Sequence, residues 1–275
     1  INNGVRLGDI KYGNSSTTLG RIGQNWGQGN NGIAINGVYP NVYVAVSATN
    51  NVNGYDNVKV FQASSGNHTE MYNIPWPNSQ SEHYIGVNLN ENNWLVINDA
   101  RNTYGINPNS YVGLTKVFKN QGVQVGQDII GHVTSTALSL NTVHNFSYPP
   151  NTPLFSERVK LVLGSYFANN QYNINGGKMF VYVLDETGTF ISYGDNYLEG
   201  DTMNDQFGYS VDISSNGNDI IGGARFGNGP ISCGSGGNAG TGYVKIYNMD
   251  YNGCTDPLAD NYNPNATVDD GTCVI

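Results

Sequence analysis

Apolar and polar residues alternate along most of this chain, in short runs that are separated by loops rich in Gly and Asn. The segment GYSVDIS (208–214) is one such run, and the turn SSNGND joins it to a second apolar run, DIIGGARF (219–226). A period of two is typical of a strand with one buried face. Two such runs around a Gly/Asn turn predict a β-hairpin.

This hairpin belongs to an order of segments that occurs four times. Each copy ends on an alternating strand; these last strands are YDNVKVFQ (55–62), YVGLTKVFK (111–119), GGKMFVYVL (176–184) and GTGYVKIYN (240–248). An apolar run precedes each last strand, at 42–51, 94–102, 159–167 and 219–226. A short strand precedes each of those runs, at 32–37, 84–90, 136–141 and 208–214.

A more variable strand opens most copies, at 6–13, 123–131 and 191–200, and MYNIPWPN (71–78) takes its place in the second copy. The third copy carries an insertion at 145–157, whose prolines exclude a central strand. The four units span about 5–62, 63–119, 123–184 and 189–249.

Four antiparallel strands per unit, repeated, predict an all-β fold: a β-propeller-like array of four-stranded blades over residues 1–250. One blade cannot bury both of its faces, so blades stack on one another. An ordinary β-sandwich is the alternative, since it also has a turn every few residues. Four copies is the low end for a closed propeller, so either the ring is small or other segments complete it.

The fourth unit resembles a known repeat. Its Phe207-Gly208 and Gly223-Ala224 dipeptides, with the strands around them, are similar to the FG-GAP repeat of integrin-α-type propellers, especially in extracellular proteins of aquatic microbes. The resemblance covers about residues 5–250 and implies a propeller. Such repeats often bind Ca²⁺ in an Asp-x-Asp-x-Asp-Gly loop, but the matching loops here lack the alternating carboxylates, so we expect no calcium in the blades.

The composition changes at about residue 250, and residues 251–275 form a separate Asp/Asn-rich module between Cys254 and Cys273. A disulfide between these cysteines would stabilise the segment by about 3 kcal/mol in the loop-entropy model. A segment this small has almost no core, so we predict that the disulfide holds it together. The pattern CTDP…NYNPNA…DDGTC resembles a short module of surface and secreted proteins from marine bacteria, microalgae and large algal viruses.

The oxygen-bearing side chains of this module have two interpretations. They converge on a Ca²⁺ ion, or they cap turns through Asx hydrogen bonds. The residues concerned are Asp256, Asp260, Asn263, Asp269 and Asp270. We expect no other cofactor.

Charge and composition exclude several partners. Only 12% of the 275 residues are charged, and the net charge is −9 with 12 Lys and Arg, which disfavours nucleic acid and anionic lipid. The longest apolar runs are short segments such as VYVAV, so no membrane span is expected. Low charge also weakens repulsion between copies and favours association.

Catalytic patterns are weak. The four histidines are scattered, and no nucleophile motif is present. The acidic run EGDTMND (199–205) is either a surface turn or the carboxylate pair of a propeller glycosidase. We expect a protein that is not an enzyme.

Some individual residues have open roles. Trp76, between two prolines, either stacks on a sugar or packs an irregular edge, and Cys233 is either a free thiol or an intermolecular crosslink. The Asn-x-Ser/Thr sequons are candidate glycosylation sites at Asn14, Asn67, Asn145 and Asn265.

These observations predict a non-enzymatic structural or interaction protein, located outside the cell or on a cell or virion surface. Its expected partners are copies of itself or other surface proteins, in an appendage, filament or virion. A carbohydrate-binding adhesin is the alternative function, with glycans as partners, and a glycosidase or lyase is a third.

Overall fold

The fold is all-β. The computed structural model describes residues 21–22, 33–36, 42–49, 55–64, 67–77, 85–89, 94–99, 113–119, 121–131, 138–144, 157–169, 175–185, 187–192, 197–214, 217, 219–227, 240, 242–249, 252–263, 266, 268–269 and 271–275. Every regular element among them is a strand, and none is a helix. The prediction of an all-β chain is confirmed.

The strands form four antiparallel sheets in chain order. The first contains β1 (Arg21–Ile22), β2 (Ile33–Asn36), β3 (Val42–Thr49), β4 (Tyr55–Ser64) and β5 (Asn67–Pro77). The second contains β6 (Ile85–Leu89), β7 (Leu95–Asp99), β8 (Leu114–Lys119) and β9 (Val123–Ile130). The third contains β10 (Leu138–His144), β11 (Glu157–Ser165), β12 (Lys178–Leu184), β13 (Phe190–Ser192) and β14 (Leu198–Glu199). The fourth contains β15 (Phe207–Ile213), β16 (Asp219–Ala224) and β17 (Tyr243–Asn248).

Each sheet is an antiparallel meander, to which the short strands β1 and β14 are added out of sequence order. The first and third sheets are four strands wide, because β1 and β2 share one edge of β3, and β13 and β14 share one edge of β12. A fifth, small sheet pairs β18 (Asn252–Gly253) in parallel with β19 (Val268–Asp269) inside the C-terminal module.

The sheets are offset by one strand from the sequence units. The segment at 71–78, which opens the second sequence unit, lies mainly in β5 and pairs with β4 of the first sheet. The segment at 123–131 lies mainly in β9 and likewise pairs backward, with β8. Each complete sheet therefore takes its last strand from the start of the following unit. The fourth sheet has three strands among the described residues, and the opening segment at 6–13 lies outside them.

The apolar pattern makes the sheets stack face to face. In β7, Leu95 and Ile97 lie in a core cluster with Val60 and Trp76 of the first sheet. Val96, between them, points to the other face and lies in a cluster with residues of the third sheet. A strand buried on both faces reads as a continuous apolar run, which explains the segment LVI. The third and fourth sheets share a further cluster that includes Val162 and Phe207.

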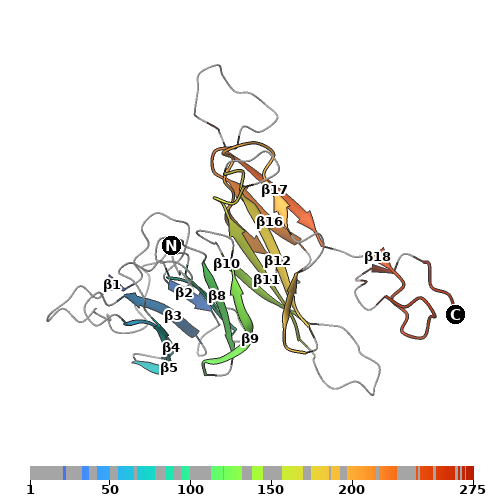
Figure 1. Cartoon of the computed structure of the whole chain (residues 1–275). Coiled ribbons are helices and arrows are strands. Elements are labelled where there is room, and N and C mark those ends of the chain that lie inside the picture. The colour runs from blue at the N-terminus through green and yellow to red at the C-terminus, as the bar shows by residue number, and fades with distance from the viewer. Residues whose placement is uncertain are drawn as a thin grey trace, which may run out of the picture.

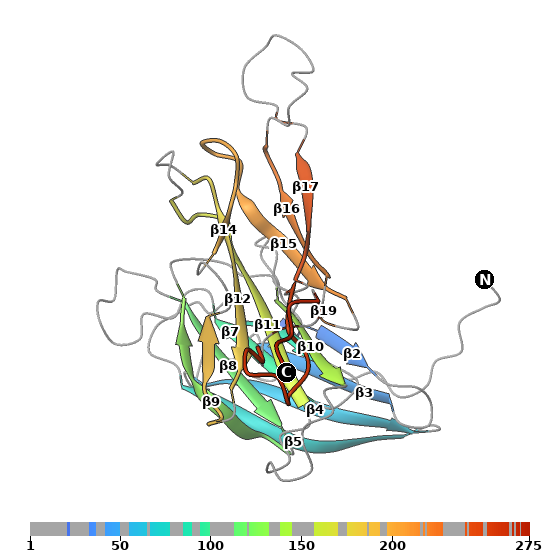
Figure 2. The same cartoon turned by 90° about the vertical axis from the view of Figure 1, so that its right-hand side faces the viewer.

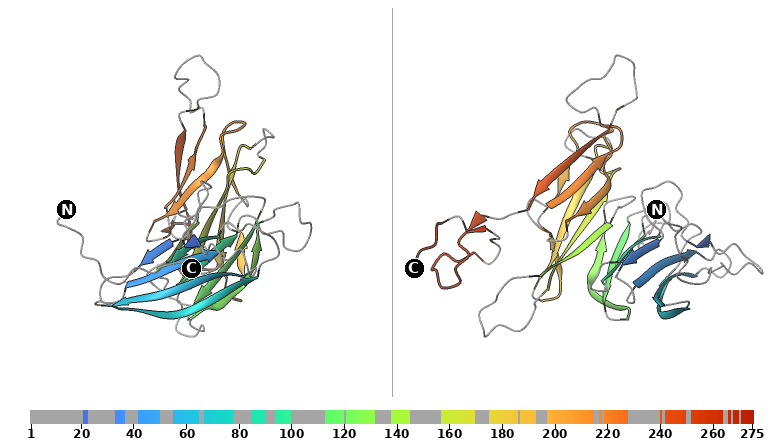
Figure 3. Two further views of the ribbon diagram at one scale, coloured as in Figure 1. Left: turned by 90° about the vertical axis from the view of Figure 1, so that its left-hand side faces the viewer. Right: turned by 180° about the vertical axis from the view of Figure 1, so that it is seen from behind.

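The first strands of successive sheets lie next to one another. β2 contacts β6, β6 contacts β10, and β10 contacts β15. The sheets form a row, with the blue and cyan strands of the first sheet at one end and the orange strands of the fourth at the other (Figures 1 and 2). No closed ring of sheets is present among the described strands. The C-terminal module lies away from the sheets (Figure 1; Figure 3, right).

Hydrogen bonds between sheets accompany the apolar contacts. Asn36 Nδ2 donates to the carbonyl oxygen of Leu89 at 3.1 Å, which joins the first two sheets. Gln127 and Phe190 join the second and third: the Gln127 amide donates to the Phe190 carbonyl at 2.7 Å and accepts from the Phe190 N–H at 2.9 Å. Such bonds are directional, so they fix the register of one sheet on the next in a way that apolar contact alone does not.

The junction between the third and fourth sheets requires glycine. A Cβ at Gly164 in β11 would lie 2.0 Å from the carbonyl oxygen of Gly208 in β15. Gly208 itself has φ +81°, a conformation that L side chains rarely adopt. The backbones of the two sheets therefore approach more closely here than any side chain allows.

We expect the Gly164→Ala variant to lose about 3 kcal/mol of unfolding free energy, since the added methyl group forces the two sheets apart. Urea unfolding followed by tryptophan fluorescence measures this loss. Gly188→Ala is the matched control. Gly188, unlike Gly164, has positive φ, +80°, but its Cβ would meet nothing within 4 Å, so we expect a loss of only about 1 kcal/mol from the backbone conformation alone. Equal losses in the two variants would contradict a close backbone approach.

Candidate functional site

The acidic run at 199–205 forms a turn between β14 and β15, and its centre is a buried carboxylate. The Asp205 carboxylate accepts hydrogen bonds from the Tyr243 hydroxyl at 2.7 Å, from the Thr202 N–H at 2.8 Å and from the Thr202 hydroxyl. Asn204 and Gln206, on either side, have φ of 65° and 57°. A left-handed conformation costs about 1 kcal/mol of conformational free energy at each of these two residues. The three hydrogen bonds to Asp205 hold the backbone in this conformation.

The other carboxylates of this turn are paired with lysines. Lys245 of β17 forms an ion pair with Asp201 and donates to the Glu199 carbonyl oxygen at 3.1 Å. Lys178 of β12 lies 3.3 Å from the Glu199 carboxylate. A glycosidase needs two carboxylates that face one sugar. Here each of the three carboxylates instead meets donors of its own chain, which supports the interpretation of the run as a structural turn.

Tyr243 links this turn to β17. Its hydroxyl donates to Asp205 and accepts from the Asp201 N–H at 2.9 Å. Burial raises the pKa of Tyr243 well above its ordinary value, and the negative charge of Asp205 raises it further. The phenol therefore stays neutral at physiological pH and acts as a hydrogen-bond donor.

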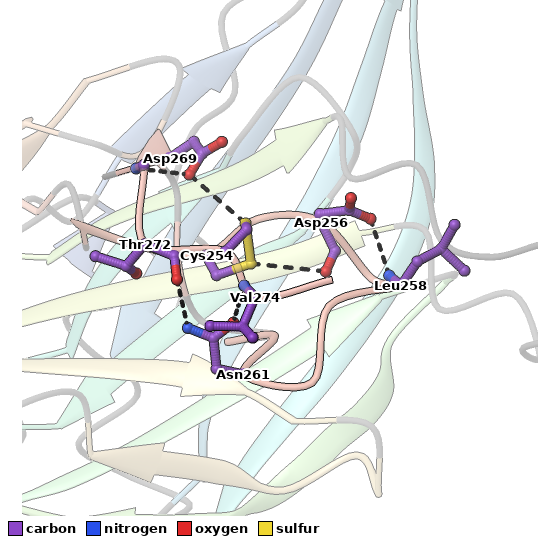
Figure 4. The surroundings of a disulfide bond; sticks show 9 residues. Cys254, Asp256, Leu258, Asn261, Asp269, Thr272 and Val274 are labelled. Carbon is purple, nitrogen blue, oxygen red and sulfur yellow. Dashed lines mark hydrogen bonds between the residues drawn. A yellow bond between two sulfur atoms is a disulfide. The ribbon is translucent and has the colours of Figure 1, made fainter.

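The C-terminal module is held by the predicted disulfide. Cys254 and Cys273 are bonded, with their Cα atoms 4.7 Å apart, and this prediction is confirmed. Asn261 adds a second connection across the module: its Nδ2 donates to the Thr272 carbonyl at 2.8 Å, and its Oδ1 accepts from the Val274 N–H at 2.8 Å (Figure 4).

Two aspartates of the module cap turns. The Asp256 carboxylate accepts from the Leu258 N–H at 2.9 Å, and the Asp269 carboxylate accepts from the Gly271 N–H at 3.0 Å (Figure 4). These are the Asx hydrogen bonds of the second interpretation. Within the described part of the chain, no group of three or more His, Cys, Asp or Glu side chains is placed to hold a metal ion. Asp270 lies outside the described residues, and the calcium site stays a prediction.

Trp76 is not an exposed aromatic. Its side chain is 1% exposed and packs between the first and second sheets. The indole Nε1 donates to the Asp99 carboxylate at 3.1 Å, and the ammonium of Lys116 lies 5.8 Å from the ring centroid. The ring therefore has no free face for a sugar, and the sugar-stacking hypothesis for this residue is wrong. Proline has no N–H to donate to a neighbouring strand, so the two prolines favour an edge strand and suggested that Trp76 is exposed. β5 is an edge strand, but the face of it that carries Trp76 is buried against the second sheet.

The remaining predicted sites are placed only in part. Asn67 begins β5 and pairs with Ser64 across the β4–β5 hairpin, inside the first sheet rather than between units. Cys233 and the other three sequons, Asn14, Asn145 and Asn265, lie outside the described residues.

Two apolar surfaces that the sequence interpretation missed lie on the end sheets. On the first sheet, Ile33 and Ile35 of β2 are 52% and 69% exposed. On the fourth, Val244 and Ile246 of β17 are 61% and 71% exposed. In each strand these residues alternate with side chains that face the neighbouring sheet, so each pair lies on the outward face of its sheet.

The repeat shows what these positions do elsewhere. Ile246 of the fourth sheet pairs with Ile221, and at the equivalent position of the first sheet Val60 pairs with Ala45. The residues at this position in the first three sheets are Val60, Val117 and Val181, which are 1%, 1% and 6% exposed because the next sheet covers them. Ile246 has the same kind of side chain without a described sheet over it.

The same comparison holds at the other end. Ile35 of the first sheet pairs with Val44, and at the equivalent position of the second sheet Leu89 pairs with Leu95. In the same way, Ile33 of the first sheet is equivalent to Val87 of the second. Leu89 and Val87 are buried against the first sheet. The signal was present in the alternation of the two end units, but it becomes informative only when the order of stacking is known.

Comparison with known proteins adds no assignment. No protein-family model matches this chain, and no curated protein matches it. Within the described ranges, no helix has the length and apolar character that a membrane span requires. A functional proposal for this chain therefore rests on its own residues.

We expect Tyr243→Phe to lower the unfolding free energy at neutral pH by about 1–3 kcal/mol, because Asp205 loses a donor and the Asp201 N–H loses its acceptor. The pKa of Tyr243 is higher in the folded state than its unfolded value of 10.0, so its contribution is complete below pH 10 and is lost as the pH rises above it. The fall in stability above pH 10 should thus be shallower in the variant.

Urea titrations between pH 7 and pH 11 measure both effects. Tyr262→Phe, which removes a hydroxyl from an exposed side chain of the C-terminal module, is the control and should leave the pH profile unchanged. A Tyr243→Phe profile parallel to that of the unsubstituted protein would contradict the placement of this hydroxyl.

Reduction of the disulfide should unfold the C-terminal module and leave the sheets folded. The crosslink contributes about 3 kcal/mol in the loop-entropy model, which is comparable to the whole stability of so small a segment. Limited proteolysis with mass spectrometry, with and without reductant, follows the two parts separately. Cleavage within 254–273 should be slow in the oxidised protein and fast after reduction, and Asn261→Ala should speed it in the oxidised protein.

Proposed function

We propose that this chain is a non-enzymatic structural or interaction protein of an extracellular, cell or virion surface, and that it is a subunit of an assembly. Its body is a propeller-like array of four blades, followed by a disulfide-stapled module. The observation that carries the proposal is the pair of exposed apolar patches at the two ends of the array, Ile33 with Ile35 and Val244 with Ile246. Exposed apolar positions of this kind mark interaction surfaces when they cluster on one face.

The propeller-like arrangement draws support from the contacts of the first strands. β2, β6, β10 and β15 contact one another in sequence, as the inner strands of blades do when they surround an axis.

Two further observations favour a surface location without catalysis. A disulfide forms and persists in oxidising surroundings, which are extracellular or periplasmic. The carboxylates of the acidic turn are engaged by Tyr243, Lys178 and Lys245, which favours a structural role for them. The adhesin alternative loses Trp76 as its sugar platform.

Light scattering after size-exclusion chromatography tests the proposal. We expect the average mass of the purified protein to rise with concentration and native material to contain species larger than one chain. A monomer at every concentration, in native extracts as well as in purified form, would count against an assembly subunit.

A further inference from the structure

We propose that copies of this chain stack head to tail, with the outer face of the fourth sheet of one copy covering the outer face of the first sheet of the next. This inference rests on the proposed function and names its partner surface. We call the face that a sheet turns toward the next sheet in the chain its downstream face, and the opposite one its upstream face.

Every junction within the chain joins a downstream face to an upstream face. The downstream face of the first sheet, with Val60 and Trp76, covers the upstream face of the second, with Leu89 and Leu95. The second covers the third and the third covers the fourth in the same sense. Among the described strands, the row therefore ends with one free face of each kind: an upstream face on the first sheet and a downstream face on the fourth.

The free downstream face has the residues of a junction. Val244 and Ile246 of β17 occupy the positions of Val58 and Val60 in β4, and both of these are buried under the second sheet. Ile221 of β16, half-buried, lies beside Ile246 on the same face. Exposed polar residues surround this apolar centre: Ser210, Asp212, Asp219 and Asn248.

The free upstream face is its counterpart. In the first sheet, Ile33 of β2 pairs with Val46 of β3, and Ile35 pairs with Val44. The corresponding pairs in the second sheet are Val87 with Ile97 and Leu89 with Leu95. All four of these residues lie on the buried upstream face of the second sheet. A sheet that carries one of these two faces is thus already built to receive a sheet that carries the other.

The two faces of one copy lie at opposite ends of the row, so in this arrangement they cannot cover each other (Figures 1 and 2). Contact between two copies covers the downstream face of one copy with the upstream face of the other. Such a contact joins unlike surfaces, and each added copy brings a new free face, so the assembly continues as a filament or closes as a ring of copies.

The test uses one charged substitution on each face. Ile246→Glu removes the downstream face and Ile35→Glu removes the upstream face, at side chains that are 71% and 69% exposed in the single chain. Each variant alone should be a monomer, with the dissociation constant raised about 30-fold or more, as for a central residue of an interface.

An equimolar mixture of the two variants gives the decisive result. The intact upstream face of the Ile246→Glu chain should bind the intact downstream face of the Ile35→Glu chain. One contact then forms and no further one can, so sedimentation velocity should show a 1:1 dimer and nothing larger. Val123→Glu, at a 62% exposed position of β9 in the second sheet, is the matched control and should assemble like the unsubstituted protein.

Other outcomes overturn the proposal in distinguishable ways. If the protein assembles and neither substitution changes this, the head-to-tail contact is wrong and the assembly function stands. If Ile35→Glu alone disrupts assembly, like faces meet instead. If the unsubstituted protein is a monomer at all concentrations and in native extracts, both proposals fail. Melting temperatures establish that the variants fold, and Ile246→Ser and Ile35→Ser replace any that do not.

Discussion

The structure depends on one constraint: a sheet that is apolar on both faces needs a cover on both. β7 shows this at the level of single residues, because Leu95 and Ile97 pack against the first sheet while Val96 packs against the third. Burial of one such side chain contributes about 2 kcal/mol. The inner sheets have apolar residues on both faces, so they are stable only with neighbours on both sides.

The polar interactions refine this stack rather than create it. Gln127 and the backbone of Phe190 exchange two hydrogen bonds between the second and third sheets, and the Trp76 indole reaches Asp99 between the first and second. The close approach of Gly164 and Gly208 sets the distance between the third and fourth sheets. At the far end, Asp205 and Tyr243 tie the acidic turn to β17 and keep that strand, with its two exposed apolar residues, in a defined position.

The C-terminal module follows a different principle. It is too short to bury a core, and it is held by the Cys254–Cys273 bond, by Asn261 and by two Asx turns. The chain thus combines a body that is stabilised by apolar contact with a terminal module that is stabilised by a covalent bond.

The sequence by itself determined the elements that depend on local pattern. Alternation and Gly/Asn turns predicted strands, the recurrence of four segments predicted stacked antiparallel sheets, and the spacing of Cys254 and Cys273 predicted their bond. Only the tertiary structure decided which segments share a sheet, that Trp76 is buried and that Asp205 holds a turn. A period of two says that one face of a strand is apolar, but it does not say which distant segment covers that face. The pairing of sheets is a long-range contact, and for that reason the exposed positions of Ile35 and Ile246 acquire a meaning only once the order of the stack is known.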